Sequence, residues 1–351
     1  MKREYQRALI FTKAPLGGLY RYKDFFQIFP LEMDGMPKSS FQKHYPNILE
    51  LWVSEEDKAK AKLPKSLEEF EQLFSTINAS LAKQDKILGL LTTFSNNLFF
   101  RYIDTIGFWG FPLFTDEPEE EANKKSSSWL LKMYSFPEFR KQVALTSFSE
   151  IKLPQVDLIP HKKFYMYYPS LDYDTDSNIL LPDTIDLLFK SYYSLDEINT
   201  MFIDAAVSYV GSAVELMDSK KTLSLLSSFT AMETMVNLEF KDIKPEVCPH
   251  CGQAKYSVAR KFREYLLKYI GNTVANKKKY NSYYQLRSKI VHTGRQLQSE
   301  SLFTDVSKDI REVEIVTRTE ILQIGKLAVV NWLLNMENSL DGSTYLFQKG
   351  S

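Results

Sequence analysis

The sequence is poor in cysteine. Its two cysteines, Cys248 and Cys251, cannot form the disulfide framework of a small secreted domain, and this scarcity indicates a reducing compartment. Charge of one sign is not in excess either, because 44 Lys and Arg balance 44 Asp and Glu and the net charge is zero. A uniformly basic coat for nucleic acid is therefore excluded, whereas a local basic patch is not.

Long apolar runs are also missing. No uninterrupted stretch of about 18 apolar residues occurs, and the N-terminal apolar run is shorter than that of a signal peptide. Glycine and proline number only 13 and 14, which excludes collagen-like and low-complexity classes. We therefore expect a soluble, cytoplasmic protein that has no transmembrane helix and no membrane partner.

Apolar residues make up 44% of the 351 residues, and a chain of this length favours two domains. In the N-terminal half, runs rich in aromatic and branched residues predict strands over residues 5–12, 23–33 and 47–54. From about residue 190 the apolar residues recur at helical spacing instead. The change lies near residues 180–192, where Pro182 interrupts any long element.

These patterns predict an α+β protein. We expect a mixed α/β sensor or scaffold domain over residues 1–188, an all-α helical bundle over 189–340 and a tail over 341–351. Ser194 and Glu197 have the spacing of a capping box and predict the start of the first bundle helix. The first predicted helix ends at Met217. The four that follow span residues 220–240, 257–271, 278–292 and 306–336.

The fourth of these helices ends in L-R-S-K-I-V-H-T-G, which places Arg287 and His292 near a helix end stopped by Gly294. Histidine suits proton transfer near neutral pH, and arginine offers a planar fork of donors for phosphate oxygens. Five helical positions advance about 7.5 Å and turn about 140°, so the two side chains do not share one stripe. One chain therefore presents an incomplete site, which two copies related by a two-fold axis would complete.

Residues 255–295 carry eleven Lys and Arg but one acidic residue, a net charge of +10 within a neutral chain. Six interleaved tyrosines in or beside this segment offer rings that stack on bases. The predicted nucleic-acid contacts are Lys277, Lys278, Lys279, Lys289 and Arg295. The alternative is that these cations only form the hydrated outer faces of two helices and pair with acidic side chains of residues 300–320.

The R-x4-H motif at the end of a bundle helix resembles the HEPN superfamily, specifically the Apea-like HEPN group. The upstream helix S-L-L-S-S-F-T-A-M-E-T-M-V-N-L-E is similar to the earlier helix of that group, which carries a glutamate. The resemblance covers residues 190–335. It implies a metal-independent endoribonuclease that works as a homodimer, often in antiviral (phage) defence or as a toxin.

The resemblance gives four candidate catalytic residues: Arg287 and His292 of the motif, Ser288 as their polar neighbour and Glu233 as the helical glutamate. Many members have Asn, Asp or His where this chain has Ser288. In the implied mechanism, His292 takes the proton of a ribose 2′-hydroxyl, which attacks the phosphorus and leaves a cyclic phosphate, while Arg287 stabilises the phosphoryl oxygens. The alternative is a non-catalytic HEPN module that binds nucleotide, RNA or a partner protein.

The motif C-P-H-C-G supplies half of a zinc knuckle through Cys248 and Cys251. The other half is missing, because the chain has no further cysteine. Three interpretations stay open: buried free thiols, a structural zinc shared by two protomers, and a redox pair. No cofactor is expected for catalysis.

Overall fold

The computed structural model describes residues 3–31, 45–60, 71–101, 108–112, 131–135, 145–162, 177–243, 246–247, 254–255, 258–300 and 306–341. The chain folds into two compact units. The first consists of residues 1–91, 97–159 and 169–181, and the second of residues 92–96, 160–168 and 182–351. An antiparallel sheet followed by a helical region confirms the predicted α+β class.

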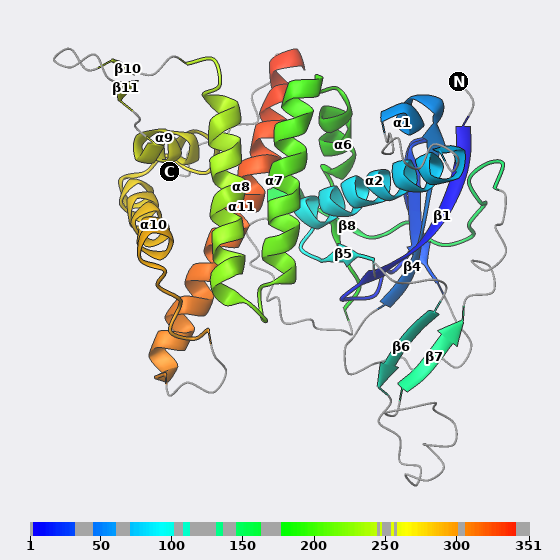
Figure 1. Ribbon diagram of the computed structural model, residues 1–351, viewed down its shortest axis with the longest axis horizontal. Coiled ribbons are helices and arrows are strands. Elements are labelled where there is room, and N and C mark those ends of the chain that lie inside the picture. Colours follow the sequence, from blue (N-terminus) through cyan, green and yellow to red (C-terminus); the bar gives the residue numbers. More distant parts are fainter. Residues whose placement is uncertain are drawn as a thin grey trace, which may run out of the picture. The chain divides into compact units, whose positions relative to one another are not determined.

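The first unit is built on a five-stranded antiparallel sheet with the strand order β2-β3-β4-β1-β5 (Figure 1). Its strands are β1 (Arg3–Thr12), β2 (Tyr20–Tyr22), β3 (Phe26–Pro30), β4 (Tyr45–Ser54) and β5 (Phe99–Phe100). The strands predicted over 5–12, 23–33 and 47–54 are confirmed as β1, β3 and β4. This unit also contains α1 (Glu55–Lys60), the β6–β7 pair (Phe108–Pro112 and Leu131–Ser135) and β8 (Leu158–Ile159).

Helix α2 (Glu71–Phe94) carries the chain from the first unit into residues 92–96 of the second. Among its buried apolar side chains, Ile87, Leu91 and Phe94 recur at the three- and four-residue spacing of one helix face. In the first unit, the ammonium of Lys83 donates to the backbone carbonyl of Trp52 in β4 at 2.9 Å. After the first unit, the chain enters its long C-terminal part within β9 (Leu181–Pro182).

The second unit is a helical bundle in which α8 packs against α7, α9 and α11, and α11 also packs against α6 and α7 (Figure 1). Its helices are α6 (Ile185–Tyr193), α7 (Glu197–Glu215), α8 (Lys221–Glu239), α9 (Val258–Tyr269), α10 (Val274–Thr293) and α11 (Lys308–Asp341). A short pair of strands, β10 (Glu246–Val247) and β11 (Ala254–Lys255), separates α8 from α9. Among the helices that the structure describes, none has the length and apolar character that crossing a membrane requires.

The positions of most bundle helices follow the predicted pattern, and two details differ. The capping box predicted at Ser194 and Glu197 is wrong, because Asp196 caps α7 by accepting the N–H of Asn199 at 2.8 Å. Residues 182–188, which we assigned to the N-terminal domain, lie in the second unit. Their last four form the first turn of α6, which buries Ile185 and Leu188.

Candidate functional site

The predicted site residues lie on α10, which is longer than the sequence predicted. Thr273 caps its start by accepting the N–H of Asn276 at 3.1 Å, and Gly294 ends it in a left-handed conformation with φ 65°. The predicted start at Lys278 is four residues late, because the first helical turn lacks apolar residues at helical spacing. The lysines at 277–279 therefore lie inside the helix and not in a turn before it.

The structure brings Arg287 of α10 together with Glu233 of α8. Nη2 of Arg287 donates to Oε2 of Glu233 at 2.9 Å, and 24% of the arginine side chain and 20% of the glutamate side chain remain exposed. Within the described residues, Arg287 makes no other hydrogen bond. A guanidinium has five N–H donors, so Glu233 can hold the group in place while other donors reach a phosphate oxygen.

His292 lies in the last turn of α10 and is exposed. Across the part of the chain that the structure describes, no hydrogen bond or ion pair of His292 is formed. Helix geometry separates it from Arg287 by about 7.5 Å along the axis and about 140° around it, so one chain does not bring the two to one point. Ser288, four residues before His292, is half-buried and lies on the same side of the helix as His292.

The basic residues predicted to contact nucleic acid differ in their surroundings. Four of them are exposed and form no ion pair with any described residue: Lys277, Lys278, Lys289 and Arg295. The ammonium of Lys279, in contrast, pairs with Glu320 of α11, and the same carboxylate accepts the hydroxyl of Tyr283. Counter-charge from residues 300–320 therefore neutralises Lys279, whereas the other four leave a basic surface.

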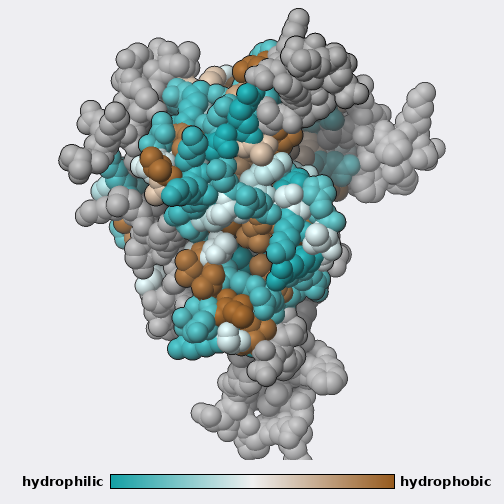
Figure 2. Space-filling model, turned by 90° about the vertical axis from the view of Figure 1, so that its left-hand side faces the viewer, coloured by the Kyte–Doolittle hydropathy of each residue, from teal (hydrophilic) through white to brown (hydrophobic). Residues whose placement is uncertain are grey.

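Two residues beside this surface, Arg263 and Tyr284, do not belong to the R-x4-H motif. Nη1 of Arg263 on α9 donates to Oδ1 of Asn281 at 2.9 Å, which brings a further cation to the outer side of α10. Burial raises the pKa of the Tyr284 hydroxyl, the nearby Glu233 carboxylate raises it further, and Arg287 opposes the rise. Figure 2 faces the side of the second unit that carries α9 and α10, and the coloured surface there is mainly hydrophilic with separate hydrophobic patches.

The segment after α10 folds back onto the start of α8. Thr222 donates both its N–H, at 2.7 Å, and its hydroxyl to Glu300, and its hydroxyl oxygen accepts the N–H of Leu297 at 3.0 Å. Glu314 of α11 accepts the backbone N–H of Gln298 and of Ser299, both at 2.9 Å. Burial acts to raise the pKa of Glu314, but these hydrogen bonds lower it overall. These hydrogen bonds hold residues 297–300, just after the end of α10, against α8 and α11.

Cys248 and Cys251 lie outside the described residues. The strands β10 and β11 pair antiparallel on either side of them, with Val247 opposite Ala254. Among the described residues, no group of three or more His, Cys, Asp or Glu side chains is placed to hold a metal ion.

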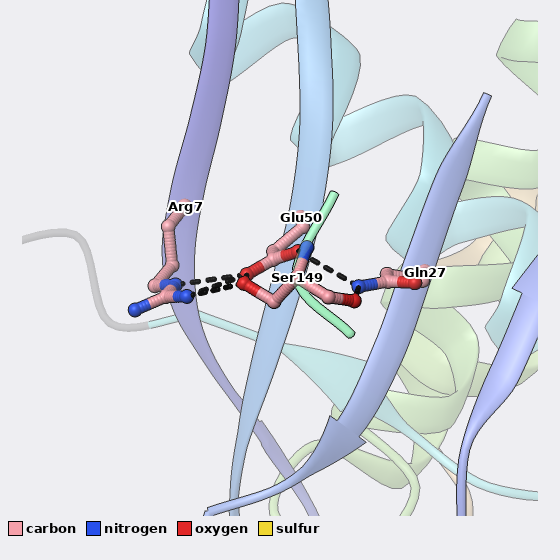
Figure 3. A network of polar contacts seen from close by, with 4 residues as sticks. All are labelled: Arg7, Gln27, Glu50 and Ser149. Carbon is pink, nitrogen blue, oxygen red and sulfur yellow. Dashed lines mark hydrogen bonds and ion pairs between the residues drawn. The ribbon is translucent and has the colours of Figure 1, made fainter. Parts of the chain in front are cut away.

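The first unit contains a buried ion-pair network centred on Glu50 of β4 (Figure 3). Arg7 and Gln27 lie opposite Glu50 on the two neighbouring strands, and the carboxylate accepts from Arg7 at 2.7 Å, from Gln27 at 2.8 Å and from the Ser149 hydroxyl and N–H at 2.7 and 2.8 Å. Burial acts to raise the pKa of Glu50, yet the hydrogen bonds from Ser149, Arg7 and Gln27 lower it overall. Because these donors occupy both oxygens of the carboxylate, we assign the network a structural role. It holds residue 149 against the sheet.

The chain matches no protein-family model, no curated protein and no solved structure at a significant level.

Proposed function

We propose that the second unit is a HEPN-type, metal-independent endoribonuclease domain. The observation that carries the proposal is the Arg287–Glu233 ion pair, which positions a partly exposed arginine on a basic helix five residues before an exposed histidine. An oriented arginine can neutralise charge on a phosphoryl group without a metal. The exposed imidazole of His292 supplies a proton acceptor.

In the proposed reaction, His292 removes the proton of a ribose 2′-hydroxyl, and the resulting oxygen attacks the adjacent phosphorus. The bond from phosphorus to the 5′-oxygen of the next nucleotide breaks, that oxygen takes up a proton, and a 2′,3′-cyclic phosphate remains. Arg287 stabilises the charge on the phosphoryl oxygens, and Glu233 acts on the substrate only through Arg287. We therefore treat Glu233 as a positioning residue and no longer as a catalytic one.

We also propose that two copies of the chain form the active enzyme. Helix geometry keeps the Arg287 and His292 side chains of one chain on different sides of α10, so a second copy supplies the missing partner at each phosphate. A role in antiviral defence or as a toxin follows from the resemblance alone and belongs to the same proposal. A structural zinc at Cys248 and Cys251 stays one of three open interpretations, and elemental analysis should find either no zinc or about one zinc per dimer.

Cleavage of a single-stranded RNA in EDTA tests the function. We expect His292→Ala and Arg287→Ala each to lower the rate about 100-fold or more, with products that end in a cyclic phosphate. Glu233→Gln should lower it less, about 10-fold, and Glu233→Asp should recover part of the loss, because a carboxylate again orients the guanidinium. The exposed Gln285 of α10 provides a matched control, since Gln285→Ala should cleave as the parent does.

Two results would contradict the proposal. Parental rates in purified His292→Ala or Arg287→Ala would remove these residues from catalysis. RNA binding by the parent without any cleavage would favour the non-catalytic module instead.

A further inference from the structure

The structure separates the tyrosines of the basic segment into buried and surface residues. Four are buried: Tyr265, Tyr269, Tyr280 and Tyr283. All four hydroxyls donate within the bundle: Tyr265 to the carbonyl of Ala328, Tyr269 to Glu239, Tyr280 to the carbonyl of Gly271 and Tyr283 to Glu320. Tyr256 lies outside the described residues. Of the five tyrosines of this segment that the structure describes, Tyr284 alone keeps part of its ring at the surface.

Tyr284 lies on a face of α10 that carries two of the exposed site residues, Lys277 and His292, together with half-buried side chains. Steps of three and four residues place five side chains on this face: Lys277, Asn281, Tyr284, Ser288 and His292. The face runs over about 22 Å from the first to the last, because an α-helix rises about 1.5 Å per residue. Arg287 follows Tyr284 by three positions and lies at the edge of the face. A nucleic-acid strand that follows this face would therefore meet Tyr284 after Lys277 and before Arg287 and His292.

The ring of Tyr284 packs against a buried ring of the neighbouring helix. Its ring contacts that of the buried Phe262 of α9, with the centroids 5.4 Å apart and the planes at 51°. Its hydroxyl forms no hydrogen bond with any described residue. A ring that is supported on one side and partly exposed is suited to stacking, because little conformational entropy is lost when a planar ligand adds to it.

We propose that Tyr284 is the residue on which an unpaired nucleobase next to the scissile phosphate stacks, so that the substrate is single-stranded RNA. This inference rests on the proposed ribonuclease function. In a duplex the base faces are covered by their neighbours, so a single ring at the protein surface can receive only a base that is splayed out of the stack. Stacking is tolerant of base identity, which predicts a requirement for a base at this position and only a weak preference among bases.

Binding of a 2′-O-methyl oligoribonucleotide, which cannot be cleaved, tests the proposal separately from catalysis. By fluorescence anisotropy, we expect Tyr284→Leu to weaken binding about 10-fold, whereas Tyr284→Phe, which keeps the ring, stays within about twofold of the parent. One abasic nucleotide placed at successive positions should weaken parental binding at one position. The same substitution should have no further effect on Tyr284→Leu, because the ring and the base act as a pair.

Tyr209 of α7 provides the matched control, since it is 41% exposed in the same unit and lies on another helix. Tyr209→Leu should bind as the parent does, and a thermal melt checks that each variant is folded. Equal binding by Tyr284→Leu and the parent, an equal loss in Tyr209→Leu, or tighter binding of a duplex than of the single strand would each overturn the stacking role and leave the ribonuclease proposal standing. No binding by the parent would overturn both.

Discussion

The side chain of Lys326, in the middle of α11, is buried. The residue is 3% exposed, and its ammonium donates to the backbone carbonyl of Ser95 and to Oδ1 of Asn96, the latter at 3.2 Å. No carboxylate pairs with Lys326 in the described part of the chain. Burial disfavours the charged amine, and it lowers the pKa of Lys326 to about 7. This residue should therefore change its charge within the folded protein near neutral pH.

The pKa of Lys326 leads to a prediction about stability. Since its folded value lies below its unfolded value, the unfolded chain binds more protons between about pH 7 and 10, and the free energy of unfolding should rise with pH across this window. Lys326→Met should lose this rise. We expect the parent to gain up to about 1.4 kcal/mol per pH unit relative to the variant, measured by urea unfolding at several pH values.

The exposed Lys278 serves as the control for this measurement, and Lys278→Met should follow the pH dependence of the parent. A constant difference between Lys326→Met and the parent over the whole window would mean that Lys326 stays charged when buried.

At the scale of single elements, the end of α10 depends on one backbone conformation. Gly294 has φ 65°, and its N–H donates to the carbonyl of Ile290 at 3.0 Å. Apart from the adjoining backbone, no atom of the described residues lies within 4 Å of the position that a Cβ of Gly294 would take. The cost of adding a side chain here is therefore conformational, because the left-handed region is unfavourable for residues with a Cβ.

Gly294 and Gly211 form a matched pair for a test of this account. Gly211 lies inside α7, and a Cβ there would also meet no atom within 4 Å, but its backbone is helical. We expect Gly294→Ala to lower the free energy of unfolding by about 1 kcal/mol and Gly211→Ala to raise it by about 0.5–1 kcal/mol. Thermal or urea unfolding measures both, and changes of the same sign would contradict the assigned role of Gly294.

At the scale of the whole molecule, the proposed dimer needs a surface that a second copy can cover. The first turns of α11 expose two apolar side chains at helical spacing, Val313 (65% exposed) and Val316 (64%). Exposed apolar side chains that adjoin on one helix face are typical of protein interfaces. Both lie on the helix that follows α10 and its site residues.

We expect light scattering of the parent to give twice the mass of the 40.8 kDa chain. The double variant Val313→Glu, Val316→Glu should be monomeric and should lose cleavage, because charged side chains at an interface core must be desolvated. Met201→Glu is the control, since Met201 is 61% exposed on α7 and its change should leave the dimer intact. A parent that is monomeric at micromolar concentration and still cleaves RNA would contradict the dimer.

Features that depend on local composition and spacing could be predicted from the sequence alone. Runs rich in aromatic and branched residues located β1, β3 and β4, and apolar residues at helical spacing located most bundle helices. The glycine that ends α10 and the position of Arg287 and His292 near that end are local in the same sense. Helix α6 was missed because it has nine residues and begins just after Pro182, where the pattern is too short to separate it from a break.

Only the tertiary structure decided which of the candidate side chains are available. Arg287 pairs with Glu233, 54 residues away, and Lys279 pairs with Glu320, 41 residues away. Whether Tyr284 or a neighbouring tyrosine reaches the surface likewise depends on where α9 and α11 pack against α10. Such contacts join residues far apart in the chain, and their partners are set by the packing of whole helices, which spacing along one helix does not encode.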